Sequence, residues 1–394
     1  MLCSVSLGLV LAMTPWFSAT AVVPELTRQW ALTAGESAWL TIAVQVGFVI
    51  GAIGAGLVNL PDVVSLRRLM AVSAALAAVS NAALLVAPNA TLAILARLFT
   101  GVLLAGVYPP ALKLLATWFV VHRGLALGSA IGALTLGSAL PHLVRASAPL
   151  EWQVVVAVTS AATLAGAVIF AWAARDGPHA YAPAIFDPCQ IGRLLRNRAL
   201  LLTSVGYFGH MWELYAMWGW FHAYSRAALA SQGWHGESAA SLVTFVVIAS
   251  GVVGCVVGGV ASDRLGRTLT AAGMMTVSGL CAALIGFTFN GPFVLYLLLA
   301  LVWGASVIGD SGQFSAMVTE AGDQRLVGTA LTLQLGIGFG LTAGAIWLLP
   351  AVAALHGTWQ WVFLALVPGP LVGTMAMVVL RRLPEARLLA GGRG

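Results

Sequence analysis

Two side chains with acid–base chemistry occur close together in a strongly apolar part of this chain. His210 and Glu213 lie within the run GYFGHMWELYAMWGWFHAY, residues 206–224. Residues three apart on a helix lie near one another, so the imidazole and the carboxylate are expected to share a face. A pair of this kind in an apolar setting can take up and release a proton near neutral pH. The alternative is a static pair that only joins two helices.

Arg97 and Asp310 are further charges inside apolar stretches. A charged side chain at the centre of a bilayer costs about 2.5–3.5 kcal/mol on insertion scales, so such residues should face protein or water. The forked guanidinium of Arg97 could bind an anionic substrate or hold a neighbouring helix through its carbonyl groups, and both readings stay open. The candidates for substrate binding or proton coupling are Glu213, His210, Arg97, Asp310, Trp16, Tyr207 and Gln313.

These residues must be held by membrane-spanning helices. Of the 394 residues, 60% are hydrophobic and 8% are charged, and the mean hydropathy is +0.95, which is typical of a polytopic membrane protein. We expect an all-α fold without a β-barrel pattern. The twelve expected spans are 2–23, 37–60, 69–88, 91–117, 123–147, 151–174, 200–225, 237–261, 268–289, 292–317, 324–350 and 357–380.

The longest polar interval divides the spans into two sets of six. We therefore expect a six-helix bundle over 1–174, a central cytoplasmic loop over 175–199, and a second six-helix bundle with a short tail over 200–394. Several glycines recur at an offset of 204 residues, among them the pairs Gly47 with Gly251 and Gly132 with Gly336. Two like-oriented halves suit a protein that rocks one half against the other around a central site.

Loop arginines indicate the orientation. Fourteen arginines fall on one side if both termini are inside, against three on the other. The positive-inside rule then places both termini in the cytoplasm and the chain in the inner or plasma membrane. The same arginines explain the pI near 9.5, so we expect no nucleic-acid partner. The four cysteines lie far apart without metal-ligand spacing, and we expect neither a metal nor a cofactor.

A short motif points to a family. The stretch GVASDRLGR at residues 259–267 resembles the loop motif G-x-x-x-D-R-x-G-R of the major facilitator superfamily, and RLFTG at 97–101 resembles its R-x-x-x-G element. The equivalent loop of the first half lacks the glycines. An aspartate beside arginines at a helix end can form charge-assisted hydrogen bonds, which suits a latch between sliding helices. The expected gating-loop residues are Gly259, Asp263, Arg264, Gly266, Arg267, Asp62, Arg67 and Arg68.

The resemblance implies more about the arrangement. In this family helices one, four, seven and ten line a central cavity, and helices two, five, eight and eleven form the moving contact between the halves. Small residues allow close approach of membrane helices, and the expected packing residues are Gly128, Gly132, Gly336 and Gly340. The stretch GVYP at 106–109 is similar to the nitrate/nitrite and cyanate-type branches. Spans two and eight lack the arginines of the nitrate branch, however, so nitrate is not the expected substrate.

The resemblance thus implies a secondary active transporter that works by alternating access, not an enzyme. Proton-coupled transport of a small metabolite, with an organic anion favoured, is the first hypothesis. The alternative is a proton-driven exporter of drugs or sugars. A receptor or sensor is a remote third, because the chain shows no soluble signalling domain. The expected partners are a small-molecule substrate, protons and the lipid bilayer, and a monomer is expected to function.

Overall fold

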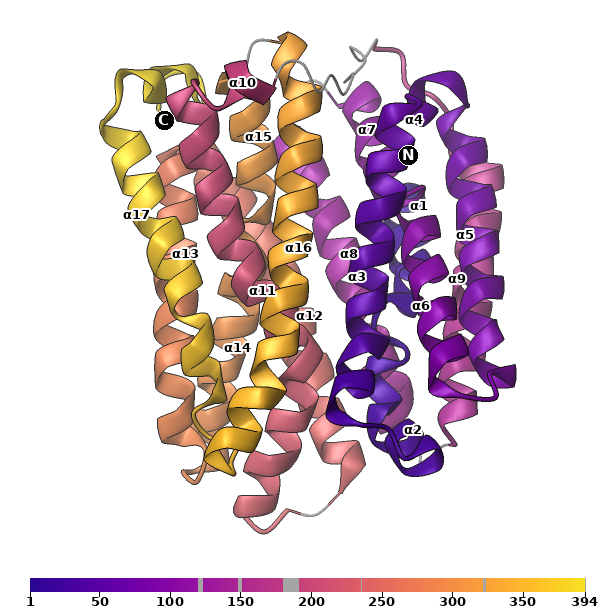
Figure 1. Ribbon diagram of the computed structural model, residues 1–394. Coiled ribbons are helices and arrows are strands. Elements are labelled where there is room, and N and C mark those ends of the chain that lie inside the picture. Colours follow the sequence, from indigo (N-terminus) through magenta and orange to yellow (C-terminus); the bar gives the residue numbers. More distant parts are fainter. Residues whose placement is uncertain (120–122, 148–150, 180–190, 235, 322–323, 394) are drawn as a thin grey trace.

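The computed structural model describes residues 1–119, 123–147, 151–179, 191–234, 236–321 and 324–393. Residues 180–190 of the expected central loop lie outside the described part. Within that part the chain is helical and contains no strand (Figure 1).

The first half of the chain begins with a broken span and ends with the helix before the central loop. Its elements are α1 (Leu2–Ala12), η1 (Thr14–Phe17), η2 (Thr20–Val22), α2 (Val23–Trp30), α3 (Ala34–Leu57), α4 (Leu60–Val63), α5 (Leu66–Ala82), η3 (Ala83–Val86), α6 (Ala90–Leu104), α7 (Tyr108–Trp118), α8 (Arg123–Ala146) and α9 (Trp152–Ala173).

The second half follows the same order of long helices and short breaks. Its elements are α10 (Ile191–Leu194), α11 (Arg198–Ser231), α12 (Glu237–Leu265), α13 (Arg267–Leu284), η5 (Ile285–Thr288), α14 (Phe293–Gly309), α15 (Ser311–Ala321), α16 (Gln324–His356), η6 (Val362–Leu366), α17 (Pro368–Arg382) and η7 (Pro384–Leu388).

The helices have the length and composition of membrane spans. Among the described residues, ten helical stretches are long and apolar enough to cross a bilayer. An eleventh candidate span is the pair Leu2–Phe17 and Thr20–Trp30, which is bent by 45° at the break between Phe17 and Thr20. The helix α11, with 34 residues, is long enough to cross as well, but its middle carries His210, Glu213 and several polar aromatic rings. The expected all-α membrane fold is confirmed.

The two halves lie side by side, and both ends of the chain lie at the same end of the bundle (Figure 1). We call this the termini end, and the opposite one, which carries α2, the α2 end. Between the halves, α8 packs on α12 and α3 packs on α16. Within the halves, the most extensive contacts include α3 on α6, α12 on α14 and α11 on α17.

Glycines lie along the contacts between the halves. A Cβ on Gly132 of α8 would lie 3.5 Å from Val252 of α12, and one on Gly336 of α16 would lie 3.5 Å from Ile53 of α3. Gly128 similarly approaches the carbonyl oxygen of Cys255, at 3.3 Å. These three glycines therefore lie at the contact between the halves.

Gly340 does not, and its expected packing role is wrong. Nothing lies within 4 Å of where its Cβ would be, because this part of α16 is exposed. The tightest glycine contacts instead lie inside a half, where Gly254 of α12 touches the carbonyl of Ala305 on α14.

Gly254→Ala is expected to lower the thermal stability of the purified protein. Its methyl group would overlap the backbone of Ala305, and overpacking of this kind typically costs about 1–3 kcal/mol. Gly340→Ala is the matched control, since its methyl group enters open space. Thermal unfolding in detergent would measure both. Equal melting temperatures for Gly254→Ala and the unsubstituted protein would show that α12 and α14 can move apart without loss.

Candidate functional site

Arg97 of α6 is fully buried and forms hydrogen bonds only within the first half. Its Nη2 donates to the Trp16 carbonyl oxygen at 2.7 Å, and its Nη1 donates to Asn81 Oδ1 at 2.9 Å. Further bonds reach Ser18 Oγ at 3.2 Å and the Leu40 carbonyl at 3.4 Å. All three guanidinium nitrogens are therefore engaged by the protein. This geometry corresponds to the helix-holding reading of Arg97, because the bonds fix the broken span at η1.

Asn81 of α5 extends this arrangement to a fifth segment. Its amide nitrogen donates to Ser160 Oγ of α9 at 2.8 Å, and its Oδ1 accepts from Ser18 at 2.7 Å. The network thus joins η1, α3, α5, α6 and α9. Asn81 did not appear among the sequence candidates, although an asparagine within an apolar span was a usable signal.

Glu213 faces the interior of the second half and does not pair with His210. Its two carboxylate oxygens accept hydrogen bonds from Trp303 Nε1 of α14 at 2.7 Å and from Ser278 Oγ of α13 at 2.8 Å. Successive helix positions turn by about 100°, so residues three apart differ by about 60° in direction. Because of this difference, Glu213 points between α13 and α14, and His210 points toward Asp310 at the end of α14.

His210 instead meets Asp310, which ends α14. The distance from His210 Nδ1 to Asp310 Oδ1 is 2.8 Å, and both side chains are almost completely buried. Asp310 Oδ1 forms no hydrogen bond among the described residues, so the contact is a close approach of the two side chains rather than a well-aligned hydrogen bond. The rings of Tyr207 and Phe314 flank the imidazole, at 6.1 and 5.6 Å between centroids. His210 Nε2 has no partner among the described residues.

Gln313 of α15 contacts the loop motif and the residue before it. Its Oε1 accepts from Arg267 Nη1 at 3.2 Å, and its Nε2 donates to the Gly258 carbonyl at 3.3 Å. Arg267 also forms ion pairs with Glu320 at 3.1 Å and with Asp263 at 3.6 Å. The motif therefore ties the turn between α12 and α13 to α15.

The remaining motif residues surround this turn. Gly266 forms the turn itself with φ +93°, a conformation that favours glycine. Gly259 is buried on α12, and Arg264 is exposed.

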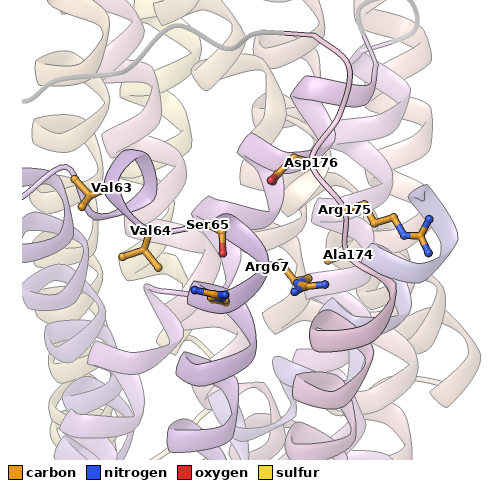
Figure 2. A pocket seen from close by; sticks show the side chains of 8 residues that line it. Val63, Val64, Ser65, Arg67, Ala174, Arg175 and Asp176 are labelled. Carbon is orange, nitrogen blue, oxygen red and sulfur yellow. The ribbon is translucent and has the colours of Figure 1, made fainter.

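The corresponding loop of the first half makes a simpler contact. Asp62 of α4 pairs with Lys113 of α7 at 2.5 Å, so the lysine near the end of span four is bound to a loop carboxylate. Arg67 and Arg68 line a hollow of about 560 Å³ at the termini end. Figure 2 shows Arg67 with Arg175 and Asp176 at this hollow, which lies within the first half and away from the contact between the halves.

Trp16 lies in a group of six aromatic rings at the contact between the halves. We call this group the central ring cluster; it consists of Trp16, Phe17, Phe48, Tyr215, Trp218 and Phe339. Three rings come from each half, and all six are buried. Trp16 stacks on Tyr215 with 5.7 Å between centroids and 23° between planes. Phe48 meets Phe339 at 4.9 Å.

Charged and imidazole side chains join the halves at the α2 end. Arg145 of α8 pairs with Glu25 of α2 at 2.5 Å and with Glu237 of α12 at 3.1 Å. Nearby, the rings of His142 and His222 stack across the two halves with 5.7 Å between centroids. The sequence reading counted Arg145 only as a loop charge, because nothing in its neighbourhood along the chain indicates a partner 92 residues away.

The comparisons with known proteins agree with this architecture. Residues 5–335 match the family model described as Major Facilitator Superfamily. The niacin transporter NiaP of Acinetobacter baylyi (strain ATCC 33305 / BD413 / ADP1) is 24% identical over 328 residues, which cover 72% of this chain and 70% of the relative.

Solved structures share the fold at low sequence identity. The proton:xylose symporter XylE has a TM-score of 0.70 and 13% identity, and the match covers 96% of this chain and 94% of XylE. The fucose:proton symporter FucP of E. coli has a TM-score of 0.67 and 13% identity, with 96% and 98% covered. An inward-facing bacterial homologue of the human lysosomal transporter Spinster also gives 0.67 and 13%, with 96% and 94% covered.

The family match runs through all of the first half and most of the second, and the helices that meet between the halves are those that the loop motif had implied. The chain belongs to the Major Facilitator Superfamily and is a multi-pass membrane transporter, not an enzyme.

Proposed function

We propose that this transporter carries a small organic anion together with a proton, by alternating access between two six-helix halves. The observation that carries the proposal is the buried contact of His210 with Asp310. We place the protein in the inner or plasma membrane with the termini end in the cytoplasm, because most loop arginines lie at that end. The α2 end, which Arg145 and Glu237 hold closed, then faces outward. The protein functions as a monomer in this proposal.

The His210–Asp310 contact suits a proton-coupling site. It is the only ion pair of either residue among the described side chains, and it lies where α14 breaks before α15. An imidazole that changes charge beside a carboxylate changes their attraction, because a charge–charge contact becomes a charge–dipole contact. A weaker or stronger attraction changes how firmly α11 is attached to the break between α14 and α15. It therefore changes how the helices of the second half can move.

Glu213 has a different role in this proposal. Both of its oxygens are bound by donors of α13 and α14, so it holds these helices on α11. The sequence suggested Glu213 together with His210 for proton handling; the contacts favour Asp310 with His210.

The favoured substrate class is a small organic anion. One relative is named a niacin transporter, and niacin carries a carboxylate at neutral pH. Because the Arg97 donors are already bound to the protein, the anion is bound by other groups. Export of drugs or sugars is the second reading, and a solute panel tests it directly.

Asp310→Asn is expected to abolish uptake above equilibrium while exchange at equilibrium continues, because asparagine keeps the size of the side chain but removes the negative charge beside which His210 takes up and releases the proton. Proteoliposomes with an imposed pH gradient and radiolabelled nicotinate would measure accumulation, and counterflow would measure exchange. Lactate, xylose and a cationic dye would be run in parallel as solutes.

Glu213→Gln is the companion variant in the same vesicles. It is expected to keep both kinds of transport at reduced thermal stability, since an amide cannot accept from both Trp303 and Ser278 as a carboxylate does. Proton-driven accumulation in Asp310→Asn, or its loss in Glu213→Gln alone, would move the coupling site away from His210 and Asp310.

Arg97→Lys is expected to lower the melting temperature without weakening nicotinate binding. A lysine cannot span the acceptors on Trp16, Asn81 and Leu40, and each buried group left without a partner costs about 1–3 kcal/mol. Thermal unfolding and radioligand binding on one purified sample separate the two effects. Normal stability with lost binding would instead assign Arg97 to the substrate.

A further inference from the structure

We propose that the central ring cluster, together with Gln45, is the substrate site, and that the substrate is a planar aromatic monocarboxylate. The inference rests on the proposed transport of a small organic anion and names the class of that anion. It starts from buried polar atoms at the contact between the halves that have no hydrogen-bond partner among the described residues.

Three side chains at the cluster carry unpartnered polar atoms. The indole N–H groups of Trp16 and Trp218 and both amide atoms of Gln45 form no hydrogen bond among the described residues, and all three side chains are at most 1% exposed. Buried polar groups in proteins are nearly always hydrogen-bonded, so each exception requires an explanation.

Unpartnered indoles are not a general property of this chain. Trp212 donates to the Ala365 carbonyl at 3.0 Å, Trp220 donates to the Ile346 carbonyl at 2.8 Å, and Trp303 donates to Glu213. Among the described residues, the buried indole N–H groups without partners are those of Trp16 and Trp218 in the central ring cluster, where the two halves meet.

Gln45 lies on the face of α3 that is turned to the second half. Residues 41, 45 and 48 share one helix face by their spacing. Thr41 lies 3.6 Å from the position of a Cβ on Gly219 of α11, and Phe48 is a member of the cluster in contact with Phe339. Gln45 is therefore positioned between two residues that contact the second half.

The chemistry of these groups defines the ligand. Two indole N–H groups and one amide NH₂ are neutral donors, which suit a single carboxylate or a ring acceptor. Arg97 is not free to bind the ligand, because its guanidinium donates to the Trp16 carbonyl and to other protein groups. A ligand with many hydroxyl groups would find too few partners here.

The rings supply the shape preference. Aromatic pairs are favourable in offset-stacked or tilted arrangements with centroids about 4.5–7 Å apart. Trp16 and Tyr215 are close to parallel across the two halves. In the state shown here the rings of the two halves cover one another. When the halves part, a planar ligand ring takes the place of the opposite ring and keeps the stacking.

Binding of radiolabelled nicotinate to the purified protein in nanodiscs tests the inference. Unlabelled benzoate is expected to compete, and cyclohexanecarboxylate, which has the same charge without a planar ring, is expected to compete about tenfold less well, as is lactate. Trp16→Phe and Gln45→Leu are each expected to weaken nicotinate binding about tenfold, since each removes hydrogen-bonding groups but keeps an apolar side chain.

Trp220→Phe is the matched control. It removes an indole N–H that is already bound to Ile346, so nicotinate binding should stay unchanged. Thermal unfolding of all variants shows that each is folded. Equal competition by benzoate and cyclohexanecarboxylate, wild-type binding in both Trp16→Phe and Gln45→Leu, or no binding of either aromatic acid would overturn the inference.

The outcomes separate this inference from the proposed function. Proton-driven uptake of lactate that is unaffected by Trp16→Phe would leave organic anion transport standing and remove the aromatic site. If nicotinate binding is weakened by the variants but no proton-driven uptake is found, the proposed substrate site stands and the proposed proton coupling is wrong.

Discussion

Each buried charge of this protein has to find its partner within the protein, because the hydrocarbon of a bilayer offers neither water nor counterions. The guanidinium of Arg97 is satisfied by carbonyl, hydroxyl and amide oxygens of three neighbouring segments. Glu213 receives an indole N–H and a hydroxyl, and Asp310 meets an imidazole. These contacts determine how η1, α5 and α6 sit together in the first half, and how α11, α13 and α14 sit together in the second.

The contact between the halves consists of other residue types than the polar networks inside each half. Aromatic rings meet in its middle, glycines of α8 and α16 allow close approach along its length, and Arg145 with Glu237 holds the α2 end. Rings and small residues can part without leaving a charge unpaired in the protein interior. The internal polar networks cannot. We infer that each half moves as a unit and that the parting surface runs through the central ring cluster.

The sequence allowed the helical spans, the family and the loop motif to be predicted, because apolar length and motif spacing are properties of a single segment. It also indicated Arg97, His210, Glu213 and Asp310, because charges stand out within apolar runs. It did not indicate which of them pair.

The pairing depends on a difference of about 60° in direction between positions three apart on α11, and on which helices pack around it. The partners of Arg97 and the contact of Arg145 with Glu237 are set by segments far apart along the chain. Gly340 shows the same limit: its spacing suggests packing, and only the position of the neighbouring helices shows that it faces outward.

The composition of α11 has a consequence for how the protein is made. Most other spans are long and apolar enough to cross a membrane without help from neighbouring helices. In contrast, α11 carries the polar side chains of His210 and Glu213 near its middle. Its carboxylate is satisfied by Trp303 and Ser278, and its imidazole by Asp310, all of which are synthesised after it. During synthesis these polar groups of α11 therefore lack their partners until α13 and α14 have been made. The stability of α11 in the membrane thus depends on helices that follow it in the chain.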